Sequence, residues 1–264
     1  MISIPTTYDV TILGAGFTGG ALVRLLAEKK FSFVASRRHP PAAGEEYIRF
    51  DLGDRSSWDA VPASRACAWL FPAEPGGMVR EFLQTMSGRL GRVVVVGTTS
   101  SYLVRAEGVT VSESTPLDRT LPRVQGELEA LAQGAVVLRA AGIYGPVSAG
   151  LPDRNPLDWL RRGMIASREK LVNLIHVDDL AAAILSAAQS DAGGEEFIVT
   201  DGTPRRWGEI EEWGRKRGFL EEVRYSAAAG GVSRKLSSAR LHARLRPNFT
   251  HTDLFAELTK LEGG

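Results

Sequence analysis

Three glycines near the N-terminus have the spacing of a phosphate-binding turn. Gly14, Gly16 and Gly19 lie in VTILGAGFTGGAL, directly after an apolar run and at the start of an amphipathic one. In a strand–turn–helix unit, the first glycine permits the turn, the second admits a pyrophosphate, and the third lets helix and strand pack closely. Free N–H groups at the helix start, around Phe17 and Thr18, favour an anion. The pattern predicts a dinucleotide site; the alternative is a glycine-rich turn without a ligand.

Two arginines follow the second apolar run and bear on which dinucleotide would bind. Ser36, Arg37 and Arg38 stand in FVASRRHP, where NAD-binding folds often carry an acidic residue for the adenosine ribose. A carboxylate would repel a 2′-phosphate, whereas a guanidinium can pair with it through two hydrogen bonds. The residues favour NADP, with NAD also open. The alternative is that both arginines belong to a solvated basic turn.

Two further loops are expected to line the same crevice. FDLGD sets Asp51 and Leu52 after the third apolar run, and FPAEPGG sets Pro72 and Ala73 after the fourth. Loops at the carboxyl ends of parallel strands form the ligand crevice of an open sheet. We therefore expect these four residues to contact the cofactor, with Asp51 near the adenine. Asp51 could equally cap the next helix.

The elements that position these residues alternate between apolar runs and helical patterns. The patterns predict strands at 8–13, 31–35, 47–50, 66–71, 92–96, 136–139, 171–175 and 197–200, and helices at 18–29, 78–86, 126–133, 178–188 and 207–216. Residues 145–156 are rich in Gly, Pro and Asn and are expected to form a loop. Strands this apolar, alternating with helices, predict an α/β fold with a Rossmann-type doubly wound parallel sheet. We expect a single body over 1–264, with a small C-terminal substrate-side lobe formed after about residue 145.

The composition limits the classes of partner. A net charge of +1 gives no sign of the basic surface that nucleic acids and membranes attract, so neither is expected as a partner. Cys67 is the only cysteine, which excludes an internal disulfide and a CxxC zinc cluster, and no metal is predicted. Without a signal-peptide pattern or an apolar run near the ~18 residues that span a bilayer, the expected location is the cytoplasm.

Four segments, in order, carry a resemblance to a known family. LGAGFTG, VVVVGTTSSY, VVLRAAGIYGP and VNLIHVDDLAAAI run from about residue 10 to residue 185. The chain resembles an extended or atypical short-chain dehydrogenase/reductase of the NAD-dependent epimerase/dehydratase group, which acts mainly on nucleotide sugars. The resemblance implies a small-molecule substrate of that kind. It also implies a monomer, or a homodimer paired through helices 78–86 and 126–133.

The resemblance implies roles for residues at the other end of the crevice. VVVVGTTSSY resembles a segment that presents a catalytic Ser or Thr, which would be Thr98, with Thr99 as the neighbouring candidate. LRAAGIYGP resembles the segment beside the nicotinamide, so Ala140, Gly142 and Ile143 would line it.

The helix that carries the family's YxxxK pair departs from the pattern. In the family the Tyr is the general acid/base, and the Lys lowers its pKa and holds the nicotinamide ribose. Aligned through Glu129 in TLPRVQGELEALA, the Tyr position is Leu121 and the Lys position is Gln125. Neither can transfer a proton near neutral pH, although Gln125 can hold the ribose by hydrogen bonds. Arg123 could meet a phosphate or carboxylate, or lie on the surface.

Two tyrosines are the local candidates for a substitute acid/base. Tyr102 and Tyr144 fall on predicted loops at the carboxyl ends of strands, with Arg123 or Arg139 as a cation that could lower a phenol pKa. The alternative is that both tyrosines only pack or hydrogen-bond.

The last segment of the resemblance is expected to be structural. His176 and Asp178 resemble a signature at a strand-to-helix junction, where the Asp caps a helix and braces the substrate lobe. Together these features favour an oxidoreductase or epimerase/dehydratase-like enzyme acting on a nucleotide sugar or a related polar substrate. The alternative is a non-catalytic NADP-binding regulator or redox sensor.

Overall fold

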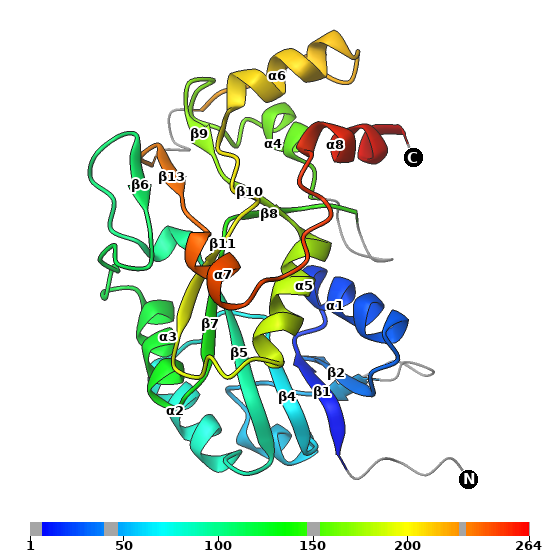
Figure 1. Cartoon of the computed structure of the whole chain (residues 1–264), viewed down its shortest axis with the longest axis vertical. Helices are drawn as coiled ribbons and strands as arrows, with labels where there is room; N and C mark the ends of the chain where they lie inside the picture. The colour runs from blue at the N-terminus through cyan, green and yellow to red at the C-terminus, as the bar shows by residue number, and fades with distance from the viewer. Residues whose placement is uncertain (1–6, 40–46, 147–153, 227–230, 264) are drawn as a thin grey trace.

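The centre of the molecule is a sheet of seven parallel strands. The computed structural model describes residues 7–39, 47–146, 154–226 and 231–263 (Figure 1). The strand order is β11-β7-β5-β4-β1-β2-β3, and every neighbouring pair is parallel. The strands are β1 (Tyr8–Leu13), β2 (Phe33–Arg37), β3 (Tyr47–Arg49), β4 (Ser64–Trp69), β5 (Leu90–Thr98), β7 (Val136–Ala140) and β11 (Glu196–Val199). The predicted doubly wound α/β sheet is confirmed. The chain reverses direction across the sheet between β1 and β4, where such folds bind ligands.

Helices cover both faces of the sheet. On one face α1 (Phe17–Glu28) and α5 (Val177–Ala188) bury their apolar sides together with Ile12 and Val94 (Figure 1). On the other, α2 (Gly76–Thr85) and α3 (Pro122–Ala132) pack with Phe82 and Val95 in a second cluster. Both faces being covered explains the nearly continuous apolar sequence of the central strands.

A third group of helices lies beyond the sheet at the top of Figure 1. Helices α4 (Pro156–Arg161), α6 (Trp207–Lys216) and α8 (Leu254–Gly263) bury Leu157, Trp207 and Leu254 in a third apolar cluster. The short strands are β6 (Val109–Val111) with β13 (Arg234–Leu236), β8 (Gly142–Tyr144) with β10 (Leu174–His176), and β9 (Leu171–Val172) with β12 (Arg205–Arg206). Two 3₁₀ turns, η1 (Arg55–Ala60) and η2 (Thr99–Ser101), and the short helix α7 (Ala239–Arg244) complete the fold. None of the described helices is long and apolar enough to span a bilayer.

Several predicted boundaries are wrong for identifiable reasons. β2 begins two residues late because Lys30, with a φ of 60°, turns the chain and the Phe31 N–H bonds back to α1. α3 begins four residues early at Pro122, because proline suits the first turn of a helix. The strand predicted at 171–175 breaks at Asn173, whose side chain bonds the backbone of β13. Of the loop predicted at 145–156, residues 147–153 lie outside the described residues, and α4 begins at Pro156.

Candidate functional site

The turn between β1 and α1 is fixed to the end of β2. Gly14 has a φ of +98°, a conformation that glycine adopts without the strain other residues would incur. Its N–H donates to the Ser36 hydroxyl at 3.1 Å, and the Ala15 N–H donates to the Ser36 carbonyl at 2.8 Å. Ser36 is buried, so it braces the turn as well as lining the crevice.

The second and third glycines have opposite surroundings. A Cβ on Gly19 would lie 2.6 Å from the Gly14 carbonyl oxygen, so helix and strand pack too closely there for a side chain. A Cβ on Gly16 would meet nothing within 4 Å. Gly16 is the N-cap of α1, whose first turn, at Phe17 and Thr18, has no acidic residue. The open space and the free N–H groups fit a bound phosphate.

A cavity of about 620 Å³ lies beside this turn. Of the residues predicted to bind cofactor, it is lined by Gly14, Ser36, Arg37, Arg38, Asp51, Leu52 and Pro72. Phe50, Phe71 and Glu74 also line it and were missed, although they belong to the segments FDLGD and FPAEPGG that were recognised. Ala73 is buried instead, with its carbonyl directly against Gly126 of α3. The three loops predicted to meet at the carboxyl ends of β2, β3 and β4 are therefore brought together.

The two arginines at the cavity are held differently. The Arg37 guanidinium lies over the Tyr47 ring, 4.1 Å from its centroid, and donates to the Tyr47 hydroxyl at 3.2 Å. Arg38 is 73% exposed, and its Nε lies 3.7 Å from Asp51 Oδ2. The other Asp51 oxygen accepts the Gly53 N–H at 2.9 Å. The helix-cap alternative for Asp51 is wrong, because Asp54 caps η1.

The other end of the crevice begins where β5 ends. Thr98 is the last residue of β5 and lies opposite Ala140 of β7. Its hydroxyl accepts the Ser100 N–H at 3.3 Å and so caps η2. Thr98 is partly exposed, whereas Thr99 is buried. Thr98 is thus the more accessible of the two candidates.

The segment expected beside the nicotinamide is a strand rather than a loop. Gly142 and Ile143 belong to β8, which pairs with β10, and a Cβ on Gly142 would lie 3.1 Å from Leu174. Ala140 is buried at the end of β7. None of the three lines the 620 Å³ cavity, and their contact with a nicotinamide stays a prediction.

Both candidate tyrosines are buried; Tyr102 lies on the segment after β5, as predicted, whereas the loop predicted for Tyr144 is strand β8. Tyr144 ends β8 with no exposed surface, and burial raises its pKa. Tyr102 is 3% exposed and accepts a 3.4 Å hydrogen bond from Arg139. Burial nevertheless raises the pKa of Tyr102 to about 12, because it outweighs the nearby cation. A phenol with such a pKa is poorly matched to proton transfer near neutral pH.

A buried network of charged side chains lies next to the end of β5 that carries Thr98. The Arg139 Nε donates to Glu127 of α3 at 2.7 Å, and Arg139 also pairs with Glu196 of β11. The Arg139 and Glu127 side chains are 0% and 2% exposed. A Cβ on Gly97 would lie 2.2 Å from Glu127 Oε1, so the carboxylate occupies the space above that glycine.

The two glutamates of α3 lie on different faces of the helix. Glu129 points away from the sheet and pairs with Arg80 of α2, while Gln125 is exposed and donates to the Arg119 carbonyl. Glu127 is the glutamate that faces the sheet. The assignment of the family's Tyr and Lys positions to Leu121 and Gln125 stays a prediction.

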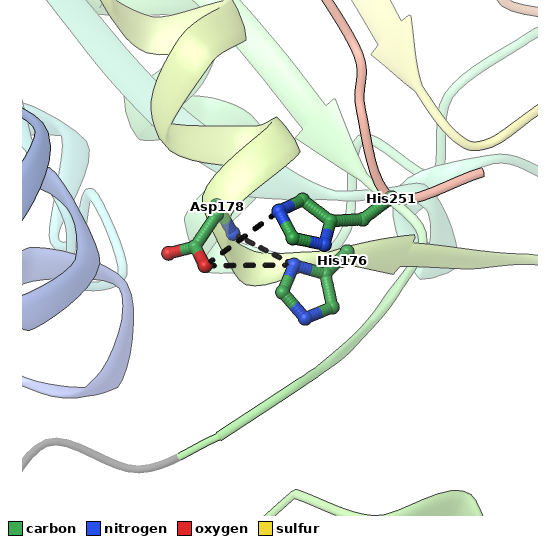
Figure 2. Close-up of side chains that lie close together, drawn as sticks. All are labelled: His176, Asp178 and His251. Carbon is green, nitrogen blue, oxygen red and sulfur yellow. Dashed lines mark hydrogen bonds and ion pairs between the residues drawn. The ribbon is translucent and has the colours of Figure 1, made fainter. Parts of the chain in front are cut away.

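A cluster of His176, Asp178 and His251 lies at the start of α5 (Figure 2). The two imidazoles stack with centroids 4.0 Å apart. His176 Nδ1 accepts the Asp178 N–H at 3.3 Å, so His176 caps the helix and not Asp178 as predicted. Asp178 instead pairs with Arg24 of α1 at 2.8 Å. Burial and the adjacent His251 lower the pKa of His176 to about 4.

This cluster suits a structural role better than a metal. A metal ion must lie near the plane of each imidazole it binds, about 2 Å from the nitrogen, and stacked rings do not converge on one point. The His176 Nδ1 lone pair is used by the backbone, and a guanidinium already neutralises Asp178. The neighbouring Asp179 accepts the N–H groups of Thr250 and His251, which ties the segment before α8 to α5.

Comparison with known proteins identifies the fold. No family model matches the chain. The Escherichia coli K12 protein YeeZ is 26% identical over 219 residues, which cover 72% of this chain and 76% of YeeZ. Among solved structures, MoeE5 in complex with UDP-glucose and NAD aligns with a TM-score of 0.76 at 21% identity, over 97% of this chain and 100% of that one.

Two further solved structures have the same fold. The ADP-L-glycero-D-manno-heptose-6-epimerase of Helicobacter pylori aligns with a TM-score of 0.77 at 14% identity, over 98% of this chain and 97% of that one. A short-chain dehydrogenase/reductase superfamily protein of Agrobacterium tumefaciens with bound NAD gives 0.74 at 18%, over 96% of each. The chain has the fold of the short-chain dehydrogenase/reductase superfamily.

Proposed function

We propose that the chain binds NADP in the cavity beside the β1–α1 turn and is an enzyme of the atypical short-chain dehydrogenase group. Its reaction is an oxidoreductase or epimerase/dehydratase-like step on a nucleotide sugar or related polar molecule, without the usual Tyr–Lys relay. The observation that carries the proposal is the open position at Gly16, next to a cavity bordered by Arg37 and Arg38. Proteins with the same fold bind NAD, and one of them binds UDP-glucose.

Different residues around the cavity would bind different parts of the cofactor. The N–H groups at the start of α1 would hold the pyrophosphate, which a helix N-terminus favours. Arg37 and Arg38 would hold the 2′-phosphate, and Asp51 and Leu52 would border the adenine. When bound, the nicotinamide supplies hydride transfer.

The choice of NADP over NAD rests on charge. The similar structures contain NAD, but this chain ends β2 with two cations at the cavity and no carboxylate. Asp51 follows β3, and the Arg38 guanidinium partly neutralises it. The end of β2, where the 2′-phosphate would bind, is therefore positive, and the two carboxylates of the cavity, Asp51 and Glu74, follow β3 and β4.

A second candidate is a non-catalytic NADP-binding sensor. It is favoured by the burial of Tyr102 and Tyr144, since neither phenol is suited to proton transfer near neutral pH. A Tyr–Lys relay would also lack its lysine in this part of the chain, because the sequence has no lysine from residue 31 to residue 169. A sensor would have to respond through the cofactor, because Cys67 is fully buried and burial raises the pKa of its thiol to about 12.

The test compares substitutions at two unobstructed glycines. Gly16→Val should fold normally, because nothing lies near its Cβ, yet obstruct the pyrophosphate and weaken NADP binding about 100-fold or more. Gly77→Val, at an equally open position in α2, should bind NADP like the parent. Calorimetry with NADP and NAD measures both. Unchanged NADP affinity in Gly16→Val moves the site elsewhere.

Turnover then separates the two candidates. A panel of nucleotide sugars, including UDP-glucose and UDP-glucuronate, is followed at the nicotinamide absorbance and by product analysis. Conversion that is lost in Gly16→Val supports the enzyme. Tight NADP binding with no conversion across the panel supports the sensor.

A further inference from the structure

Arg123 lies where α3 meets the end of β5. The segment just before α3 is fixed to η2, because the Asp118 N–H donates to the Ser101 carbonyl at 2.8 Å. Tyr102 and Leu117 also form a bridge there. The first turn of α3, which contains Arg123, is therefore adjacent to the turn that follows Thr98.

The phase of α3 directs Arg123 toward the sheet. Residues four apart on a helix lie on the same face, and Glu127, four residues later, has its carboxylate over Gly97. Arg123 is thus about one helical turn, or roughly 5.4 Å, nearer the N-terminus of α3 than Glu127 is. This places it on the side of Thr98. Burial raises the pKa of Glu127, and the charges of Arg139 and Arg123 both oppose that shift.

Among the residues that the structure describes, Arg123 forms no ion pair of its own, although its charge acts on Glu127. The nearby Glu127 carboxylate already accepts from Arg139 at 2.7 Å. Within the described ranges, Arg123 makes no hydrogen bond or ion pair, and its side chain is partly buried. Five unpaired N–H donors in a partly desolvated position are a binding capacity that a planar oxyanion can meet.

A second arginine reaches the same turn from β13. The Arg234 Nη2 donates to the Thr99 carbonyl at 2.9 Å, and burial lowers the pKa of that guanidinium. Two cations from distant parts of the sequence therefore border η2, which adds positive potential beside Thr98.

We propose that Arg123 binds a carboxylate of the substrate beside Thr98, so that the preferred substrate is an acidic nucleotide sugar. The inference rests on the proposed function and names the class of its substrate. A guanidinium does not release its proton in the range where proteins are stable. Arg123 therefore orients the substrate by two parallel hydrogen bonds and does not replace the proton relay.

The test uses two ligands that differ by one carboxylate. The chain is saturated with NADP, whose affinity is measured first, and is titrated with UDP-glucuronate and with UDP-glucose. The parent should prefer UDP-glucuronate by at least about tenfold, the contribution of a charge-assisted hydrogen bond. Arg123→Met should abolish the preference, and Arg123→Lys should reduce it. Arg80→Met, a surface change beside the exposed face of α3, should leave it unchanged.

The outcomes are separable from those of the proposed function. Absence of NADP binding refutes the cofactor site before any sugar is added. With NADP bound, equal affinity of the parent for both sugars, or binding of neither, overturns the carboxylate site. An equal loss for both sugars in Arg123→Met also overturns it, because the guanidinium then contacts the shared diphosphate. If Arg123→Met does not fold, a full preference retained by Arg123→Lys overturns the requirement for a guanidinium.

Discussion

The two ends of the crevice are built on different principles. At the end proposed to bind adenine, three loops shape an open cavity, and Arg38 is largely exposed. At the end proposed to bind the nicotinamide, the charges lie inside the protein, where Arg139 and Glu127 are almost without exposed surface. The charges at the first end border the open cavity and can pair with a ligand. Most of the charges at the second end pair with one another inside the protein.

The energetic consequences differ accordingly. An exposed pair such as Arg38 with Asp51 contributes about 0–1 kcal/mol and can exchange its partner for a ligand. Breaking a buried pair costs several kcal/mol, because the remaining charge is desolvated without compensation. Substitutions of the arginines at the cavity should therefore act on binding, and those within the buried Arg139–Glu127 network on folding.

The largest expected effect tests the buried pair against a surface pair on the same helix. Glu127→Ala leaves Arg139 buried beside only Glu196 and should lower the free energy of unfolding by about 3–5 kcal/mol. Glu129→Ala removes an exposed pair with Arg80 and should cost no more than about 1 kcal/mol. Urea denaturation measures both. Equal losses would remove the distinction between the two faces of α3 and, with it, the placement of Arg123.

The next effect tests the adenine end. Arg37→Ala combined with Arg38→Ala should reduce the preference for NADP over NAD by about tenfold to a hundredfold, which corresponds to about 1.5–3 kcal/mol. The preference of the parent should also fall as salt rises, since Arg38 is exposed. Arg49→Ala, an exposed arginine of β3 paired with Asp54 outside the cavity, is the control. A ratio of dissociation constants that does not change would exclude the arginines from cofactor choice.

The sequence predicted which loops meet at the cavity because the geometry there is local. The spacing of Gly14, Gly16 and Gly19 requires only a strand, a turn and a helix, and parallel strands bring the loops after them together. The extended backbone of β1 and the side of α1 that faces the sheet both follow from patterns of apolar residues close together in the sequence. Phe50, Phe71 and Glu74 were missed, and Ala73 is buried instead of lining the cavity.

The nicotinamide end was harder because burial there is set by contacts distant in the sequence. β8 is three residues long and acquires its partner β10 from thirty-two residues further on, so Tyr144 is not recognisable as a strand residue. Glu127 and Glu129 have equal claims by sequence, and the choice depends on Gly97, whose missing side chain leaves room for one carboxylate. The cap at α5 likewise depends on the His176 ring and not on the more usual Asp178.

The smallest expected effect concerns Tyr102 and decides whether the buried network has any part in proton transfer. Tyr102→Phe removes one hydroxyl, which accepts a long 3.4 Å bond from Arg139, and should cost about 0.5–1.5 kcal/mol of stability. Because burial raises the pKa of Tyr102 to about 12, the folded phenol stays protonated at every pH up to well above 9. Its removal should therefore leave the pH dependence of turnover unchanged between pH 6 and 9, on whichever substrate the chain converts.

A structural Tyr102 and a catalytic one differ in what a phenylalanine changes. If the hydroxyl only supports Arg139, Tyr102→Phe lowers stability slightly and keeps the parent pH profile. If it is the acid/base, the rate falls by about 10²–10⁴-fold and one limb of the profile disappears. The second result would require the phenol to lose its proton near neutral pH, and a bound cofactor or substrate would then have to bring more positive charge to this end of the crevice than Arg139 supplies alone. The contrast between exposed charges that bind a ligand and buried charges that stabilise the fold would then fail at this residue.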